Sequence, residues 1–116
     1  MASRSDVVII DFRPVAPNAG VRPALVVQND QYNARMSNTI VAQITTNIRW
    51  VDEVTQLSID PNHPDWAASG LHRPSAVNCS NLYTIEQRDI ARTIGSLSAA
   101  TMREIDDCLK AALDIS

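Results

Sequence analysis

Arginine is the residue type in this chain whose abundance first points to a chemistry. Nine of the ten basic side chains are arginine, and Lys110 is the only lysine. The planar guanidinium offers paired donors that match the oxygens of a phosphate group. Residues 1–50 hold five arginines against three aspartates, whereas residues 51–116 hold five basic and ten acidic side chains. A net charge of −3 is not typical of nucleic-acid-binding proteins, but a locally positive site is compatible with this distribution.

The other reactive side chains give no metal or phosphate-loop signature. His63 and His72 are far from any cysteine or carboxylate cluster at ligand spacing, and we expect both to be solvated loop residues. The chain has only three glycines and no loop of the P-loop kind. Cys79 and Cys108 are too few for a disulfide scaffold. We expect them to be small buried hydrophobic residues, and a nucleophilic cysteine is the alternative. The sequence therefore predicts no metal site.

Six short segments have the composition of β-strands, being apolar or alternating and rich in β-branched residues. They are residues 7–12, 23–28, 39–45, 55–59, 76–79 and 90–94. Residues 29–38 and 60–74 are polar or proline-rich and are expected to be loops. Thr84 with Gln87 fits a capping box, which predicts one helical turn there.

The C-terminal segment contains the one clear helix. Ser98 suits the N-cap, and an apolar stripe at helical spacing follows it. The stripe consists of Met102, Ile105, Cys108, Leu109, Ala112 and Leu113. These elements predict a single α+β domain over residues 1–116, a small closed or half-closed β-barrel of about six strands with a C-terminal helix. No apolar run has the length of a signal or membrane-spanning segment, so we expect a cytoplasmic protein with no membrane association.

Several ordered motifs resemble one known family. The segment Gly20–Asp30 has the G-x-R-P loop end followed by an apolar strand closed by Asn-Asp. Val8–Pro14 is similar to the family's first strand and D-[LF]-x-P turn, and Ile40–Thr45 resembles its third strand. Gly95–Ser98, with the apolar positions after it, resembles the start of the family's terminal helix. On these motifs the chain resembles the MazF/PemK toxins, the mRNA interferases of type II toxin–antitoxin systems.

The resemblance implies a fold, an activity and partners. The fold is an SH3-like barrel that forms a homodimer. The activity is sequence-specific, metal-independent cleavage of single-stranded RNA without a cofactor. The partners are RNA and a small MazE-like antitoxin that holds the toxin inactive. At the family's catalytic positions this chain has Arg22 and Thr45. From residue type alone they would be a surface arginine and a strand-end β-former.

Arg22 and Thr45 suit cleavage by the ribose 2′-OH. In that reaction the 2′-OH attacks the adjacent phosphorus, charge gathers on the non-bridging oxygens, and the 5′ oxygen leaves. Fixed donors aimed at that charge are usually the largest catalytic contribution. Arg22 can donate through its paired N–H groups and Thr45 through its hydroxyl. Arginine stays protonated, so Arg22 is assigned to charge stabilisation and the general base is not assigned.

Six further residues are expected to bind RNA. The resemblance places Asn18, Ser75, Ser80 and Asn81 where the family reads bases, and short polar groups can both donate and accept hydrogen bonds. Trp50, beside Arg49, offers a stacking surface, although a core or interface role is the alternative. The stretch Asn78–Tyr83 lacks the arginine and aspartate that some family members use there. The base preference of the family is therefore not carried over.

Two other classes of function stay open at this point. A toxin on a related fold could inhibit DNA gyrase by protein contact, a role that suits the acidic balance of the chain. A catalytically inactive member could serve as a binding module. The Arg22 and Thr45 pair favours the ribonuclease.

Overall fold

The computed structural model describes residues 1–116 and contains six strands and three α-helices. The strands are β1 (Asp6–Asp11), β2 (Val21–Val26), β3 (Asn38–Thr45), β4 (Gln56–Ile59), β5 (Ser75–Glu86) and β6 (Ile90–Ser96). The helices are α1 (Asp30–Arg35), α2 (Trp66–Ser69) and α3 (Ala99–Leu113), with a 3₁₀ turn η1 (Gln87–Asp89). Every predicted strand is present, so the α+β class is confirmed.

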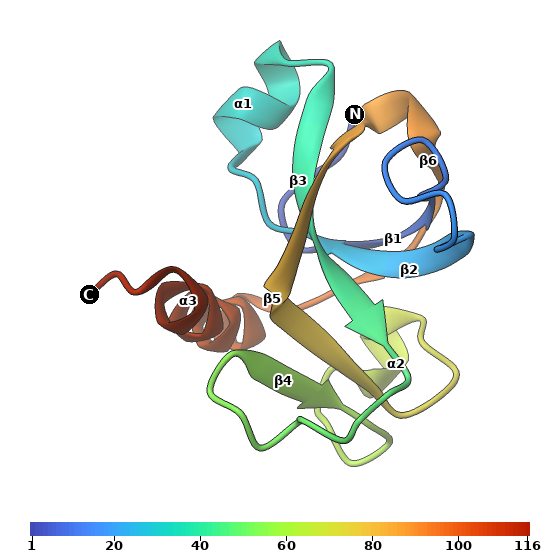
Figure 1. The fold of residues 1–116 in the computed structure, drawn as a ribbon. Helices are drawn as coiled ribbons and strands as arrows, with labels where there is room; N and C mark the ends of the chain where they lie inside the picture. The colour runs from blue at the N-terminus through green and yellow to red at the C-terminus, as the bar shows by residue number, and fades with distance from the viewer.

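The six strands form one antiparallel sheet in the order β4-β5-β3-β2-β1-β6. Figure 1 shows this sheet strongly curved. However, β4 and β6 are its two edges and do not pair with each other. The sheet is therefore not a closed barrel, and the prediction of a closed or half-closed barrel is not confirmed. Part of the reason lies at β6. A Cβ on Gly95 would stand 2.1 Å from the carbonyl oxygen of Ala68, so the α2 segment lies directly against that edge strand.

The sheet buries apolar side chains on both of its faces. Val7 and Leu25 face each other across β1 and β2 and belong to the cluster under α3. Their neighbours Val8 and Ala24 belong to a second cluster on the opposite face, with Phe12. Strands buried on both faces need nearly continuous apolar sequence rather than alternation, which explains the run Val7–Ile10.

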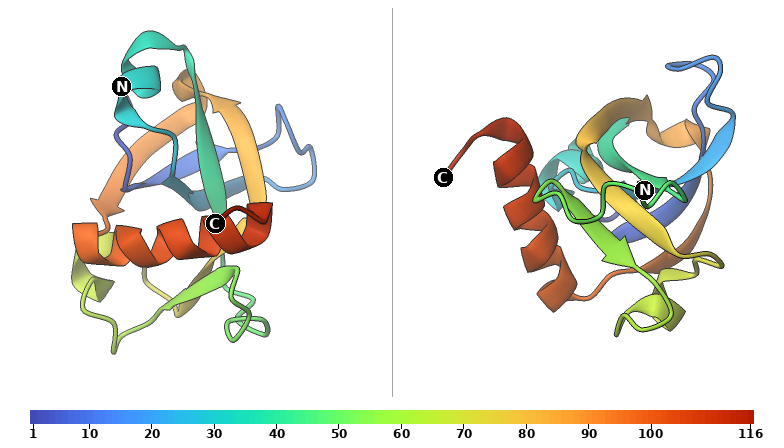
Figure 2. Two further views of the ribbon diagram at one scale, coloured as in Figure 1. Left: turned by 90° about the vertical axis from the view of Figure 1, so that its left-hand side faces the viewer. Right: turned by 60° about the horizontal axis from the view of Figure 1, so that its bottom comes forward.

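Helix α3 covers one side of the sheet. Figure 2 shows it lying across the strands, where it contacts β4 and β5. The predicted N-cap is confirmed, because the Ser98 hydroxyl accepts a hydrogen bond from the Thr101 N–H at 3.3 Å. The stripe is buried at Met102, Ile105 and Cys108. Leu113 was also expected to pack, but it is exposed because the helix ends there and the chain turns at Asp114.

Three predicted details are wrong. The segment 29–38, expected to be a loop, contains α1, which Asn29 caps by accepting from the Tyr32 N–H at 2.9 Å. The 60–74 loop contains the one-turn helix α2. The predicted helical turn from Thr84 is instead the end of β5, where Thr84 pairs with Ile40. Gln87 begins η1, and its side chain is used elsewhere, accepting from the Ala2 N–H at 2.8 Å. No helix is both long and apolar enough to cross a membrane.

Candidate active site

Arg22 and Thr45 line the same cavity, although 23 positions separate them in the chain. The cavity has a volume of about 300 Å³. Its walls come from the start of β2, the end of β3 with the turn after it, and the start of β5. The lining residues are Arg22, Pro23, Gln43, Ile44, Thr45, Thr46, Asn47 and Ser75. None of them is acidic, so Arg22 gives this cavity a positive character.

The strand register explains why Arg22 and Thr45 meet. Strands β2 and β3 are antiparallel, with Ala24 opposite Gln43 as the last pair of their ladder. Continuing that register by two residues places Arg22 opposite Thr45, and directly opposed residues of an antiparallel pair share a face of the sheet. Thr45 also pairs with Ala76, which places Ser75 of β5 beside it. Arg22 of β2, Thr45 of β3 and Ser75 of β5 therefore lie together at one end of the sheet.

Two polar side chains of the cavity, those of Arg22 and Thr45, keep free donor capacity. The Thr45 oxygen accepts a hydrogen bond from the Asn47 N–H at 3.0 Å, which leaves the Thr45 hydroxyl proton able to donate outward. Ser75 is buried, and its hydroxyl donates to the Arg73 carbonyl oxygen at 2.7 Å. Arg22 is exposed and belongs to neither of the two ion pairs of the structure. The arrangement can therefore present a guanidinium and a hydroxyl to one anionic group.

The other predicted RNA-binding residues lie outside this cavity. Asn18 is exposed on the loop between β1 and β2. Arg49 and Trp50 lie on the exposed loop between β3 and β4, with the Arg49 guanidinium 5.7 Å from the centre of the Trp50 ring. Ser80 and Asn81 lie on β5, at an irregularity where the β3 register shifts between Ala42 and Gln43. Of the six residues, Ser75 alone lines the cavity.

Asn81 is nevertheless connected to the cavity through Gln43. The Asn81 side-chain amide donates to the Gln43 side-chain oxygen at 2.9 Å, and Gln43 is a lining residue. Sequence reasoning did not single out Gln43, Thr46 or Asn47. The only signal for Thr46 and Asn47 was their position directly after Thr45, and Gln43 stands inside a strand where nothing marks it.

The histidines and cysteines lie at structural or surface positions outside the Arg22 cavity. His72 is exposed, as predicted, whereas His63 is half-buried because its Nδ1 accepts from the Asp65 N–H at 3.0 Å. Both cysteines are buried, as predicted. Burial raises the pKa of the Cys79 thiol to about 12 and also raises the pKa of Cys108. A thiolate nucleophile is therefore not available at neutral pH. No three His, Cys, Asp or Glu residues cluster in a way that could hold a metal ion.

Comparison with known proteins agrees with this fold and arrangement. Residues 3–113 match the family described as PemK-like, MazF-like toxin of type II toxin–antitoxin system. The chain is 33% identical to "Endoribonuclease MazF6" of Mycobacterium tuberculosis over 118 residues, covering 97% of each chain. It is 31% identical to "Endoribonuclease EndoA" of Bacillus subtilis over 115 residues, covering 97% of this chain and 95% of that one.

A solved structure shares the fold over the whole chain. It is described as an endoribonuclease in complex with its cognate antitoxin from a mycobacterial species. The match has a TM-score of 0.80 at 23% identity and covers 100% of this chain and 98% of that one. The fold and the family match define a small α+β toxin domain. The chain belongs to the PemK-like, MazF-like toxin family of type II toxin–antitoxin systems.

Proposed function

We propose that the protein is the toxin of a type II toxin–antitoxin module and a sequence-specific endoribonuclease that cuts single-stranded mRNA in the cytoplasm. The observation that carries the proposal is the single cavity that Arg22, Thr45 and Ser75 line without any acidic residue. The names of the relatives support it, because MazF6 and EndoA are both described as endoribonucleases.

The reaction is an intramolecular transesterification. The 2′ oxygen of the ribose forms a bond to the adjacent phosphorus, and the bond from that phosphorus to the 5′ oxygen of the next nucleotide breaks. One proton leaves the 2′ oxygen and one reaches the 5′ oxygen, so the products are a 2′,3′-cyclic phosphate and a 5′-OH. Arg22 donates to the non-bridging oxygens as they gain charge, and the Thr45 hydroxyl donates to the same group. These fixed donors provide the charge stabilisation without a metal ion.

Residues around the cavity select the RNA sequence. Asn81 is coupled to the cavity by its hydrogen bond to Gln43, and Ser75 forms part of the wall. Ser80 lies next to Asn81 on β5, and Asn18 is exposed on the β1–β2 loop. Trp50 is 51% exposed under the Arg49 guanidinium, so its ring is accessible for stacking on an unpaired base.

The protein acts as a homodimer that a MazE-like antitoxin inhibits. The mycobacterial structure that shares this fold is itself described as a complex with its cognate antitoxin. Exposed apolar side chains, among them Val21, Ile48 and Val54, provide surface for such contacts. Sedimentation at micromolar concentration is expected to show a dimer, and a monomer alone would contradict this part of the proposal.

End mapping tests the activity. The purified protein is incubated with a long RNA, with and without chelator, and the chemistry of both new ends is determined. We expect cuts at one short motif, a 2′,3′-cyclic phosphate upstream, a 5′-OH downstream, and the same rate with chelator. Chelator-sensitive cleavage that leaves a 5′-phosphate would contradict the mechanism. An RNA that stays intact would contradict the proposal and favour a binding module.

A further inference from the structure

A second cavity opens directly beside the one that holds Arg22 and Thr45. Its volume is about 210 Å³. The two cavities share Pro23, Thr46 and Ser75 as a common wall. The two cavities are therefore neighbours on one surface, and a ligand bound in the first can reach into the second.

The lining of the second cavity differs in chemistry from that of the first. Ile9, Leu71 and Ile94 give it apolar walls, and the exposed residues His72 and Arg73 add two nitrogen-bearing side chains. No acidic residue lines it. An apolar compartment bordered by a guanidinium suits a flat ring that is attached to an anion.

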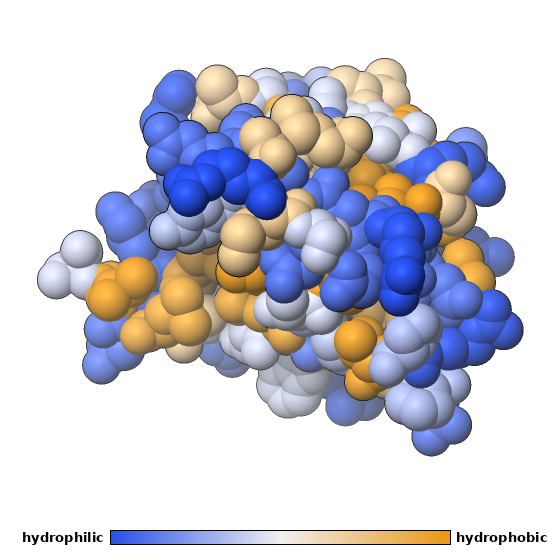
Figure 3. Space-filling model, turned by 90° about the horizontal axis from the view of Figure 1, so that it is seen from above, coloured by the Kyte–Doolittle hydropathy of each residue, from blue (hydrophilic) through white to orange (hydrophobic).

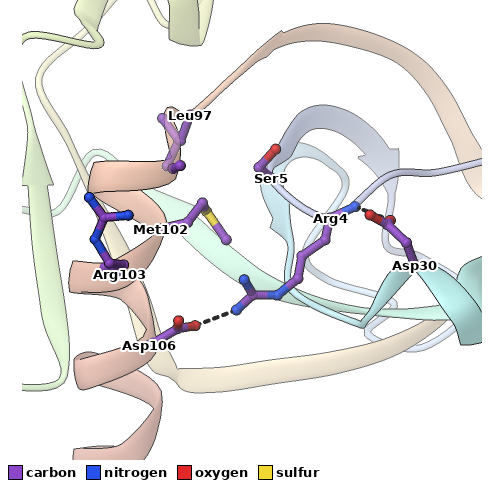
Figure 4. A pocket seen from close by; sticks show the side chains of 8 residues that line it. Arg4, Ser5, Asp30, Leu97, Met102, Arg103 and Asp106 are labelled. Carbon is purple, nitrogen blue, oxygen red and sulfur yellow. Dashed lines mark hydrogen bonds and ion pairs between the residues drawn. The ribbon is translucent and has the colours of Figure 1, made fainter.

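The other two cavities of the protein fit such a ligand less well. The largest, of about 420 Å³, lies between the N-terminal segment and α3 and contains two carboxylates, Asp30 and Asp106. Figure 4 shows that the Arg4 guanidinium already donates to Asp106, while the Arg4 backbone N–H donates to Asp30. The cavity at Arg88 and Arg92 is basic but shares no lining residue with the Arg22 cavity. The face of the molecule seen in Figure 3 has its apolar atoms in separate patches among hydrophilic ones.

The segment that carries His72 and Arg73 is fixed against the sheet. Gly70 has φ +73°, and a Cβ there would stand 2.2 Å from the Ile94 carbonyl oxygen, so this backbone touches β6. The Ser69 hydroxyl oxygen accepts from the Leu71 N–H at 3.2 Å. The Ser75 hydroxyl holds the Arg73 carbonyl oxygen and also forms part of both cavities. The second cavity therefore has a defined position relative to Arg22.

We propose that this second cavity is a nucleobase subsite for the nucleotide next to the cleaved phosphodiester. The ring enters between the aliphatic side chains, His72 stacks on its exposed face, and the Arg73 guanidinium donates to the adjoining phosphate or base edge. This inference rests on the proposed ribonuclease function. It makes His72 and Arg73 determinants of which RNA is bound, in addition to the residues on β5.

The test measures binding of a short single-stranded RNA that contains the mapped cut site. The RNA carries a 2′-hydrogen at the cut nucleotide, which prevents its cleavage. Its binding is compared with that of RNAs that lack the base at one flanking position each. We expect one neighbouring position at which removing the base weakens wild-type binding by about fivefold or more, the usual scale for one stacked base. His72→Ala and Arg73→Ala each weaken binding of the intact RNA. They show little further loss when that same base is missing, because the partner of the base is already gone.

The control variant is Arg88→Ala, which removes an exposed arginine from the cavity that shares no residue with this one. It should keep the full penalty of the abasic position. If the loss of RNA affinity from a variant and the loss from the missing base multiply when the two are combined, the inference is overturned. The absence of any sensitive position would overturn it as well. So would variants that weaken self-association while leaving RNA binding unchanged. A wild-type protein that cuts no RNA fails the proposed function, whereas one that cuts but shows no such coupling fails this subsite alone.

Discussion

Arg22 and Thr45 occupy opposed positions on neighbouring strands, two residues beyond the last paired residues of β2 and β3. The register that sets Ala24 opposite Gln43 places them on one face at one end of the sheet, and both line the same cavity. The backbone geometry of two neighbouring strands therefore places both residues at this cavity before any ligand arrives. Donors whose positions are set in advance cost less reorganisation during a reaction.

Replacement of Arg22 is expected to have the largest effect on cleavage. Arg22→Ala should lower the rate on a fixed RNA by roughly a hundredfold or more, the usual scale for one transition-state donor. Arg22→Lys should not restore the rate fully, because an ammonium group cannot make the paired contact. Arg103→Ala, another exposed arginine in a different cavity, is the matched control and should keep its activity. Equal rates for Arg22→Ala and the control would argue against the assigned role.

Thr45→Val tests the hydroxyl with little change in shape. We expect a rate loss of about tenfold or more with only a small change in melting temperature. Valine preserves the β-branched packing at the strand end, and water can replace the acceptor that the exposed Asn47 N–H loses. Thr84→Val makes the same change at an exposed position of β5 and should have no effect on cleavage. Single-turnover rates for the two variants decide the matter, and a fully active Thr45→Val enzyme would remove Thr45 from the mechanism.

The residues on β5 are expected to control the cleaved motif. Replacing Ser80 and Asn81 with glutamate and glutamine should shift the cut sites without abolishing cleavage. The reason is that Asn81 reaches the cavity through Gln43 and does not line it with Arg22. Sequencing the ends produced from a diverse RNA pool measures the shift. Unchanged cut sites would limit Ser80 and Asn81 to a structural role.

Asp65 links the 60–74 segment to the start of α3 and predicts a pH dependence of stability. Its carboxylate accepts from the Ser98 N–H at 2.8 Å and from the Ser98 hydroxyl at 2.9 Å. Burial raises the pKa of Asp65, but these hydrogen bonds and one from Thr101 outweigh burial and hold the pKa below its ordinary value. The ionised Asp65 carboxylate therefore contributes to the free energy of unfolding above the unfolded pKa of about 3.9. This contribution is lost as the pH falls through the lower folded pKa.

Asp65→Asn should lower the free energy of unfolding by about 1 kcal/mol at pH 7, because one charged acceptor is lost. The difference between wild type and variant should shrink as the pH drops below about 4, where Asp65 of the unfolded chain begins to bind a proton, and further as the pH falls through the lower folded pKa. Urea unfolding of both proteins at pH 7 and at pH 3 measures this difference in the free energy of unfolding. A difference that is the same at pH 7 and pH 3 would contradict the role of the carboxylate charge.

Sequence patterns were sufficient for the elements whose signals are local. The apolar runs of β1, β2 and β3 and the Ser98 cap of α3 all lie within a few residues of where they were predicted. The full length of β5 was not predictable, because the polar residues Ser80 and Asn81 interrupt its apolar pattern and its second half pairs with β3 beyond the register shift at Ala42. That the sheet stays open was not predictable either, because the packing at its edges depends on tertiary contacts such as that of the α2 segment with Gly95.

The candidate site also combines features that sequence motifs predict with features that depend on tertiary contacts. The positions of Arg22 and Thr45 follow from motifs, and their meeting follows from the pairing of two adjacent strands. The contribution of Gln43 depends on a hydrogen bond to a residue 38 positions away, which no local pattern encodes. His72 was expected to be only a solvated residue, and its place beside the cavity depends on how the 60–74 segment folds back onto β6.

Cleavage of an RNA that lacks a single 2′-OH tests the central claim most directly. The substrate carries hydrogen in place of the 2′-OH at the mapped cut nucleotide only, and a control RNA carries the same change two nucleotides downstream. The nucleophile of the proposed reaction is that hydroxyl, so the first RNA should stay whole at this site while the control is cut at the normal rate. Cleavage of the first RNA at the same bond would contradict the account, because water would then have to be the nucleophile.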